Sequence, residues 1–352
     1  MDSSAGSGVA RYDAVLVVSF GGPEAPEDVL PFLEKVTAGR GVPAERLLEV
    51  ASHYDHFGGR SPINDQNRVL IAALRLELDT HSLDLPVYWG NRNWHPLLAD
   101  TVRQMEADGV RNALAFVTSA YSSYSGCHQY REDIEAARQV VGLSAPAIDK
   151  IRPFFNHPGF VETQAELVLQ TLSGLTTTEL AGCRLAFCAH SIPTAQAETC
   201  DYVQQLLEVS RLVAAFVSTA LGRAFGWDLV FQSRSGPPQV PWLEPDVLEH
   251  VQTLAKAGDT SAVVLVPAGF VSDHMEVCYD LDTEALTVAS ELGLVARRVP
   301  TVGTHPKFIA AIRELIEERL FDSPTRRSIG ELPAMPDACS AGCCPVPRRT
   351  SP

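Results

Sequence analysis

Short, uninterrupted runs of Val, Leu, Ala and Phe recur along this chain of 352 residues, and each run is followed by small or polar residues. Such runs, without alternating polar positions, are typical of strands buried on both faces of a parallel sheet. The runs occupy residues 14–20, 86–89, 113–118, 184–189, 229–232 and 262–267. Helical apolar spacing separates them, at residues 24–34, 65–78, 97–108 and 158–172. The pattern predicts an α/β protein whose helices cover its parallel sheets.

The alternation of strands and helices occurs twice, so we expect two similar lobes. We place the first lobe at residues 12–160 and the second at residues 161–322. Residues 1–11 are small and polar, and we expect them to be disordered. Residues 323–352 form a Pro-rich tail that would also be disordered unless its cysteines tie it down. Ligands of such folds bind at the carboxyl ends of the strands, where most of the unusual residues of this chain lie.

Composition excludes several classes of protein. A net charge of −15 argues against nucleic acid or an anionic membrane as a main partner. No apolar run approaches the ~18 residues of a membrane span, and the first twelve residues lack an apolar signal core. We therefore expect a cytoplasmic protein, whose eight cysteines are thiols or metal ligands before they are disulfides.

A histidine, His190, directly follows the apolar run 184–189. At the end of a buried strand its imidazole would point into the crevice beside the sheet. Neutral imidazole can bind a metal ion or accept a proton near pH 7. Taken alone, however, the position is better explained by a histidine that only hydrogen-bonds a loop backbone.

Three acids, Glu276, Asp280 and Glu284, recur at every fourth position after the run 262–267. They lie near one line on a helix, and a wider π-type turn would align them more closely. The alternative is a solvated acidic face, which would place Lys or Arg four residues away. None occurs between residues 274 and 290, and stacked acids repel one another. The spacing therefore favours a functional line of carboxylates.

The segments around the histidine and the acids resemble the two signature segments of the ferrochelatase family. They read Cys188-Ala-His190-Ser-Ile-Pro193 and, from residue 269, Gly-Phe-Val-Ser-Asp-His-Met-Glu-Val-Cys-Tyr-Asp-Leu-Asp. Further matches, in family order, are Val18-Ser-Phe20-Gly-Gly-Pro, Gly58-Gly-Arg-Ser61-Pro-Ile63, Tyr88-Trp-Gly-Asn-Arg92 and residues 232–243. The resemblance covers residues 12–322 and implies two Rossmann-like, chelatase-type lobes without a dinucleotide site. Consistently, the chain has no Gly-x-Gly-x-x-Gly.

The resemblance also implies the chemistry, which is insertion of Fe²⁺ into a porphyrin. His190 would accept protons and contact the iron, and Glu276 would bind iron and begin a relay. Asp280 and Glu284 would carry protons or hydrated iron to and from solvent, with His274 orienting Glu276. Which of His190 and Glu276 takes the iron first stays open.

Contacts to the porphyrin are implied at further positions. Ser61 and Tyr130 match residues that hydrogen-bond propionates. Phe20 stands where one branch of the family has a Tyr that approaches the iron, so it should pack flat on the porphyrin and cannot ligate metal. His53 and Tyr54 match an Arg-Tyr pair of that branch, which alters one propionate contact.

The cysteine pattern is similar to that of ferrochelatases with a [2Fe–2S] cluster, which takes four thiolates. Neighbouring ligands at 343 and 344 would strain the backbone, so Cys200 or Cys183 is an alternative fourth ligand. A disordered tail with incidental thiols is the other explanation. The four candidates are Cys127, Cys339, Cys343 and Cys344.

We expect the substrate to be coproporphyrin III, and the product coprohaem. The stretch 34–46, which corresponds to the apolar lip of protoporphyrin-using relatives, has no aromatic residue but contains Lys35, Arg40 and Arg46. These cations suit the propionates of a porphyrin that needs no membrane. We expect a monomer, and a coprohaem decarboxylase is a possible downstream partner.

Three alternatives stay open. The enzyme could use protoporphyrin IX, or it could be a related chelatase that loads cobalt or nickel, although such relatives usually have a histidine in place of Glu276. A haem-binding or iron–sulfur sensor, which is not an enzyme, would have no need of the carboxylate line.

Overall fold

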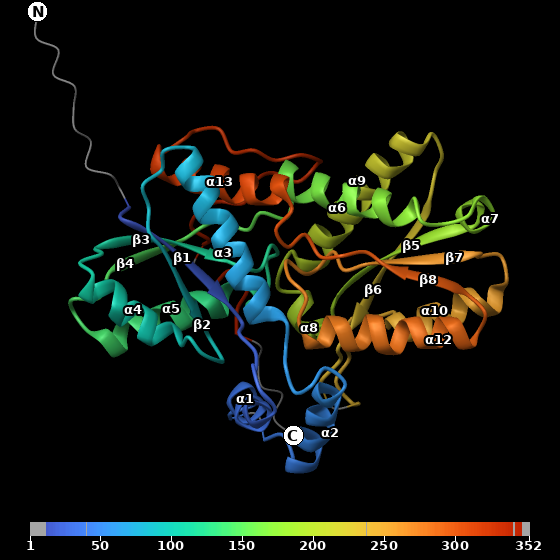
Figure 1. Cartoon of the computed structure of the whole chain (residues 1–352), viewed down its shortest axis with the longest axis horizontal. Coiled ribbons are helices and arrows are strands. Elements are labelled where there is room, and N and C mark those ends of the chain that lie inside the picture. Colours follow the sequence, from blue (N-terminus) through green and yellow to red (C-terminus); the bar gives the residue numbers. More distant parts are fainter. Residues whose placement is uncertain (1–11, 40, 237, 341, 347–352) are drawn as a thin grey trace, which may run out of the picture.

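The computed structural model describes residues 12–39, 41–236, 238–340 and 342–346. The expected disordered segment 1–11 and the lip residue Arg40 lie outside these described residues. The described chain has two four-stranded parallel sheets side by side, flanked by helices (Figure 1). This architecture confirms the predicted fold class.

The two sheets share one topology. The strands of the first sheet are β1 (Ala14–Ser19), β2 (Val87–Asn91), β3 (Asn112–Val117) and β4 (Ala147–Lys150). The strands of the second sheet are β5 (Cys183–His190), β6 (Gly226–Gln232), β7 (Ala262–Val266) and β8 (Val295–Arg298). Their spatial orders, β2-β1-β3-β4 and β6-β5-β7-β8, are equivalent, and every neighbouring pair is parallel. The carboxyl ends of equivalent strands therefore offer equivalent positions for functional side chains.

A continuous apolar core joins one face of both sheets to a shared set of helices. Side chains of β1 alternate between faces, so Val15 and Val17 enter this core while Leu16 and Val18 face the opposite way. The shared helices are α3 (Ile63–Thr80), α6 (Pro158–Leu172), α9 (Tyr202–Leu221) and α13 (Pro306–Leu320). Helix α13 of the predicted second lobe packs on α3 of the first lobe as well as on α6. The lobes therefore share this core, and the boundary at residue 160 stays a prediction.

Other helices cover the outer faces of the sheets (Figure 1). They are α4 (Leu98–Ala107) and α5 (Gln129–Val141) in the first lobe, and α10 (Val247–Ala257) and α12 (Leu286–Glu291) in the second. A hairpin of α1 (Val29–Val36) and α2 (Ala44–Asp55) projects from the first lobe. The short helices are η1 (Pro26–Asp28), η2 (Tyr124–His128), α7 (Thr177–Ala181), α8 (Thr194–Ala197), α11 (Met275–Val277) and η3 (Cys278–Ala285).

The described part of the tail has neither helix nor strand, yet hydrogen bonds fasten it to both halves of the chain. The amide of Asn156 donates to the carbonyls of Leu332 (2.8 Å) and Pro333 (3.1 Å). Glu208 of α9 accepts a hydrogen bond from the backbone N–H of Glu331. Proline richness therefore coexists with a defined path for this segment.

None of the helices in the described ranges combines the length and the apolar character that crossing a membrane requires.

Candidate active site

In each sheet the first strand in the chain lies between the second and the third. The order reverses there, and at such a point parallel sheets bind ligands in the crevice outside the carboxyl ends of the strands, here β1 and β3 and, equivalently, β5 and β7. Phe20 follows β1 and Tyr130 follows β3, whereas His190 ends β5 and Glu276 follows β7. The fold thus gathers the residues that the sequence singled out at equivalent sheet edges.

His190 and Glu276 face each other. Nε2 of His190 lies 3.7 Å from Oε2 of Glu276, and both side chains are partly exposed, at 35% and 48%. Nδ1 of His190 lies 2.5 Å from the carbonyl oxygen of Ser191 and donates its proton there, which leaves Nε2 as an acceptor. One metal ion can contact two ligand atoms that are up to about 4.2 Å apart, with bonds of about 2.1 Å. The pair can therefore hold a divalent ion or share a proton.

Tyr202 binds the backbone of His190, and a second histidine, His274, lies beside Glu276. Tyr202, at the start of α9, donates its hydroxyl to the carbonyl of His190 (3.0 Å). Nδ1 of His274 lies 3.9 Å from Oε2 of Glu276, and the orienting role of His274 stays a prediction. Burial lowers the pKa of His274, so its imidazole is neutral at neutral pH.

The line of carboxylates continues from Glu276 into η3, which is a π-helix, as the spacing of the acids suggested. Asp280 accepts hydrogen bonds from the amide of Gln232 (3.1 Å) and from the hydroxyl of Ser233. Burial raises the pKa of Asp280 to about 7, and burial also raises the pKa of Glu284. A carboxyl group that titrates near neutral pH is suited to passing protons.

Phe20 and Tyr130 are joined by Arg92, whose role the sequence did not reveal. The guanidinium lies 5.8 Å from the ring centre of Phe20 and 4.7 Å from that of Tyr130. Asp133 fixes it through an ion pair of 2.8 Å. Phe20 itself is 37% exposed and touches Phe32 of α1 edge-on, so its ring is free to meet a flat ligand. The only sequence signal for Arg92 was its place in a matched motif.

Ser61 and Tyr54 are both buried in this structure. A Cβ placed on Gly22 would lie 2.7 Å from that of Ser61, so the glycine permits the close approach of the two loops. Burial and the nearby carboxylate of Glu276 raise the pKa of Tyr54. His53 stacks on Tyr279 of η3, with ring centres 3.9 Å apart. Propionate contacts from Ser61, Tyr54 and Tyr130 stay predictions.

The four candidate cluster cysteines lie in one neighbourhood. A hydrogen bond between Cys127 and Cys339 raises the pKa of Cys127 and lowers that of Cys339 to about 7. The sulfur atoms of Cys343 and Cys344 are 3.6 Å apart, close to the roughly 3.7 Å between two thiolates on a tetrahedral ion with 2.3 Å bonds. The positive charge of Lys150 partly opposes the rise in the pKa of Cys127 and contributes to the fall in that of Cys339.

Cys344 has a φ of 50°, in the left-handed region that residues other than glycine rarely adopt. Of the two alternative ligands, Cys200 hydrogen-bonds Cys344, whereas Cys183 packs in the core at the start of β5. In the described ranges no group of three or more His, Cys, Asp or Glu side chains is close enough together to hold a metal ion. The number and chemistry of the thiols nevertheless fit a [2Fe–2S] cluster.

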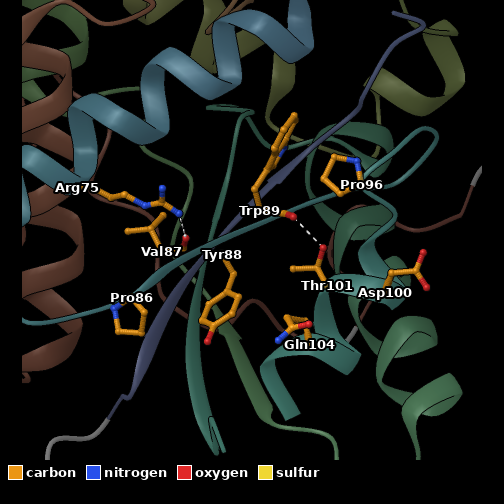
Figure 2. Close-up of a pocket in the computed structure, with 9 residues that line it drawn as sticks. All are labelled: Arg75, Pro86, Val87, Tyr88, Trp89, Pro96, Asp100, Thr101 and Gln104. Carbon is orange, nitrogen blue, oxygen red and sulfur yellow. Dashed lines mark hydrogen bonds between the residues drawn. The ribbon is translucent and has the colours of Figure 1, made fainter. Parts of the chain in front are cut away.

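An open hollow of about 660 Å³ lies elsewhere, beside edge strand β2 (Figure 2). Two of its polar side chains bind the backbone: Arg75 donates to the carbonyl of Val87 (2.6 Å) and Thr101 to that of Trp89 (2.7 Å). It contains none of the predicted site residues, so we place the active site in the crevice instead.

The fold and the site together define a two-lobed, chelatase-type protein. The ferrochelatase family model matches residues 12–320, and the chain belongs to this family. Coproporphyrin III ferrochelatase of Streptomyces coelicolor is 53% identical over 95% of this chain and 94% of its own length. Ferrochelatase of Rhodopirellula baltica is 52% identical over 96% of this chain and 95% of its own.

Among solved structures, SirB from Bacillus subtilis with Fe³⁺ superposes with a TM-score of 0.54. The match covers 90% of this chain and 98% of that protein, at 11% sequence identity. At this identity the likeness shows the common two-lobed fold alone.

Proposed function

We propose that this protein is a coproporphyrin III ferrochelatase, an enzyme of the lyase class that inserts Fe²⁺ into coproporphyrin III and yields coprohaem. The observation that carries the proposal is the His190–Glu276 pair, 3.7 Å apart at the carboxyl ends of β5 and β7. It joins a metal ligand and a proton acceptor on the same side of the crevice. Relatives about as long as this chain and named for this activity support the choice of substrate.

Metallation replaces the hydration shell of Fe²⁺ with four pyrrole nitrogens and releases two protons. His190, whose Nδ1 donates to the carbonyl of Ser191, is suited to taking a pyrrole proton on Nε2 while Glu276 contacts the incoming iron. Asp280 and Glu284 then pass protons along η3 towards solvent. On the opposite side Phe20 supports the plane of the macrocycle, with Arg92 beside it.

The stretch 34–46 supports coproporphyrin as substrate only in part, because not all of its three cations are available to bind propionates. Lys35 is exposed on α1, but Arg46 is ion-paired with Glu49 at 2.6 Å, and Arg40 is outside the described residues. The stretch exposes no aromatic side chain that would suit a membrane-held substrate. The preference for coproporphyrin therefore depends mainly on the similarity to the named relatives.

Side-by-side metallation rates with coproporphyrin III and protoporphyrin IX test the proposal. We expect kcat/KM to favour coproporphyrin III by about tenfold or more in detergent-free buffer, since one charged hydrogen bond contributes roughly 1.5–3 kcal/mol. Equal or reversed preference would leave a ferrochelatase that uses protoporphyrin IX. Absence of metallation with both porphyrins would contradict the enzyme assignment itself.

We also propose that Cys127, Cys339, Cys343 and Cys344 bind a [2Fe–2S] cluster. Such a cluster supplies one-electron redox chemistry when it is bound. The support is the neighbourhood of four thiols, the positive charge of Lys150 beside two of them, and the fastening of the tail.

Anaerobically purified protein should be reddish-brown and contain about two irons and two acid-labile sulfides per chain. Cys127→Ser should remove the colour and the sulfide, while Cys183→Ser, a core cysteine, should keep both. Colour loss in Cys200→Ser, with colour retained in Cys343→Ser, would move the fourth ligand to Cys200. A colourless, iron-free wild type would refute the cluster.

The remaining parts of the proposal come from composition and family resemblance. They are a cytoplasmic location, a monomeric state and delivery of coprohaem to a decarboxylase. Size-exclusion chromatography with light scattering tests the monomer directly.

A further inference from the structure

Arg298, the last residue of β8, binds two carboxylates at once. Its Nε and Nη2 contact the two carboxylate oxygens of Asp282 at 2.6 and 2.9 Å. Its Nη1 donates to Asp273 at 3.0 Å. The side chain of Arg298 is only 16% exposed, so water screens these contacts less than it screens an ordinary surface pair.

Asp273 and Asp282 lie on either side of Glu276 and Asp280 in the sequence. Asp273 lies three residues before Glu276, at the turn that leaves β7, and Asp282 lies two residues after Asp280 within η3. The single guanidinium of Arg298 therefore fixes both ends of the segment 273–282. The N–H of Asp273 also donates to the side chain of Gln66 on α3 (2.8 Å), which ties this end to the first lobe.

This segment needs an external support. A π-helix of eight residues is rare in proteins, and the carboxylates aligned along this one repel one another. It contains no Lys or Arg of its own. Within the described chain, the ion pairs that residues 273–285 make with Arg or Lys all go to Arg298.

We propose that Arg298 is a positioning residue for metallation, which keeps the segment 273–282 in the register that points Glu276 at His190. The inference rests on the proposed function of that pair. Arg298 itself touches neither member of it and acts through Asp273 and Asp282.

A purely structural ion pair would stabilise the lobe without affecting the site. The same sheet offers a matched control, because Arg184 of β5 contacts Asp228 of β6 with both Nη2 (2.7 Å) and Nε (3.2 Å). This pair lies near the start of the strands, at the opposite end from the crevice. Its removal should lower stability alone.

The experiment compares Arg298→Met, Arg298→Lys, Asp282→Asn and Arg184→Met in the full chain. Co²⁺ affinity without porphyrin is measured by titration calorimetry, together with kcat, porphyrin KM and Tm. We expect Arg298→Met to weaken Co²⁺ binding and lower kcat by about tenfold each, with KM within about twofold. Arg298→Lys should be intermediate, since an ammonium cannot grip two carboxylates bidentately. Asp282→Asn should resemble Arg298→Lys in Co²⁺ affinity and kcat. Arg184→Met should change Tm only.

Wild-type Co²⁺ affinity and kcat in Arg298→Met would overturn the proposal, as would an equal loss in Arg184→Met. Should Arg298→Met not fold, Arg298→Lys and Asp282→Asn decide in the same way. The proposed function fails separately, if wild-type protein does not metallate porphyrin or if His190→Ala binds Co²⁺ as tightly as wild type.

Discussion

The turns after β3 and β7 are equivalent in topology but carry different chemistry. Each leads into a π-helix, η2 in the first lobe and η3 in the second. The first presents Cys127 to the tail, whereas the second aligns Asp280 and Glu284 behind Glu276. A π-helix thus carries a cysteine thiol in the first lobe and a line of acids in the second.

The strand ends β1 and β5 repeat the contrast, with Phe20 in one lobe and His190 in the other. An aromatic ring offers a flat apolar surface, and an imidazole offers a lone pair. We propose from this comparison that the first lobe holds the macrocycle and that the second handles iron and protons.

This division between the lobes predicts the largest losses for the second lobe. His190→Ala and Glu276→Ala should each lower kcat for metallation by about a thousandfold, because both act at the reacting centre. Circular dichroism should show a folded protein in both cases. A near-wild-type rate from either variant, with iron and porphyrin in excess, would break the assignment.

Asp280→Asn should lower kcat by about tenfold or more. It should also remove the rise of kcat with pH that ionisation of Asp280 causes in the wild type. The pKa of Asp280 is about 7, and a proton acceptor must be ionised, so wild-type kcat should rise as the pH passes that value. A pH–rate profile of the variant that still shows this rise would assign it to another group.

The same substitution should stabilise the fold at high pH. Between about pH 4 and its raised pKa, folded Asp280 keeps a proton that the unfolded chain loses, so wild-type stability falls over this range. Asparagine carries no charge, and the variant should gain about 2 kcal/mol in the free energy of unfolding at about pH 8.5. Urea titrations at about pH 5 should show a smaller gain, and a gain independent of pH would contradict the burial argument.

Phe20→Ala tests the first lobe. Loss of a packing surface should raise porphyrin KM by about five- to tenfold, equivalent to 1–1.5 kcal/mol, and change kcat less. Phe20→Leu, which retains apolar area, serves as the control. A thousandfold fall in kcat for Phe20→Ala would erase the contrast between the lobes.

The smallest effect is expected at the outer end of the acid line. Glu284→Ala should reduce kcat only about two- to threefold, because water can replace one step of a proton relay. A loss as large as that of Glu276→Ala would show instead that Glu284 belongs to the reacting centre.

The sequence predicted six of the eight described strands, because strands buried on both faces leave continuous apolar runs. It missed β4 and β8, which are only four residues long, lie at a sheet edge and are partly exposed. It also predicted the line of acids, since Glu276, Asp280 and Glu284 follow a regular spacing. The pairing of His190 with Glu276 came from the family resemblance, because 85 intervening residues leave no local signal for a contact.

Arg92 and Arg298 illustrate what the sequence alone could not give. Each is one arginine among many, and its role depends on partners that only the folded chain assembles, such as Tyr130 for Arg92 and Asp282 for Arg298. The course of the tail was likewise hidden, since Asn156 and Glu208, which hold it, are far away in the sequence.

The apolar core that joins both sheets limits how far the two lobes can move apart in the folded protein. Separating the lobes would expose that core, so amides of β1 and β5 should exchange with deuterium only through global unfolding. The hairpin of α1 and α2 is attached differently, since a small cluster around Phe32 and Tyr54 connects it to Met275 and Tyr279 of the second lobe. We therefore expect amides of α1 and α2 to exchange through local openings, well before those of β1 and β5.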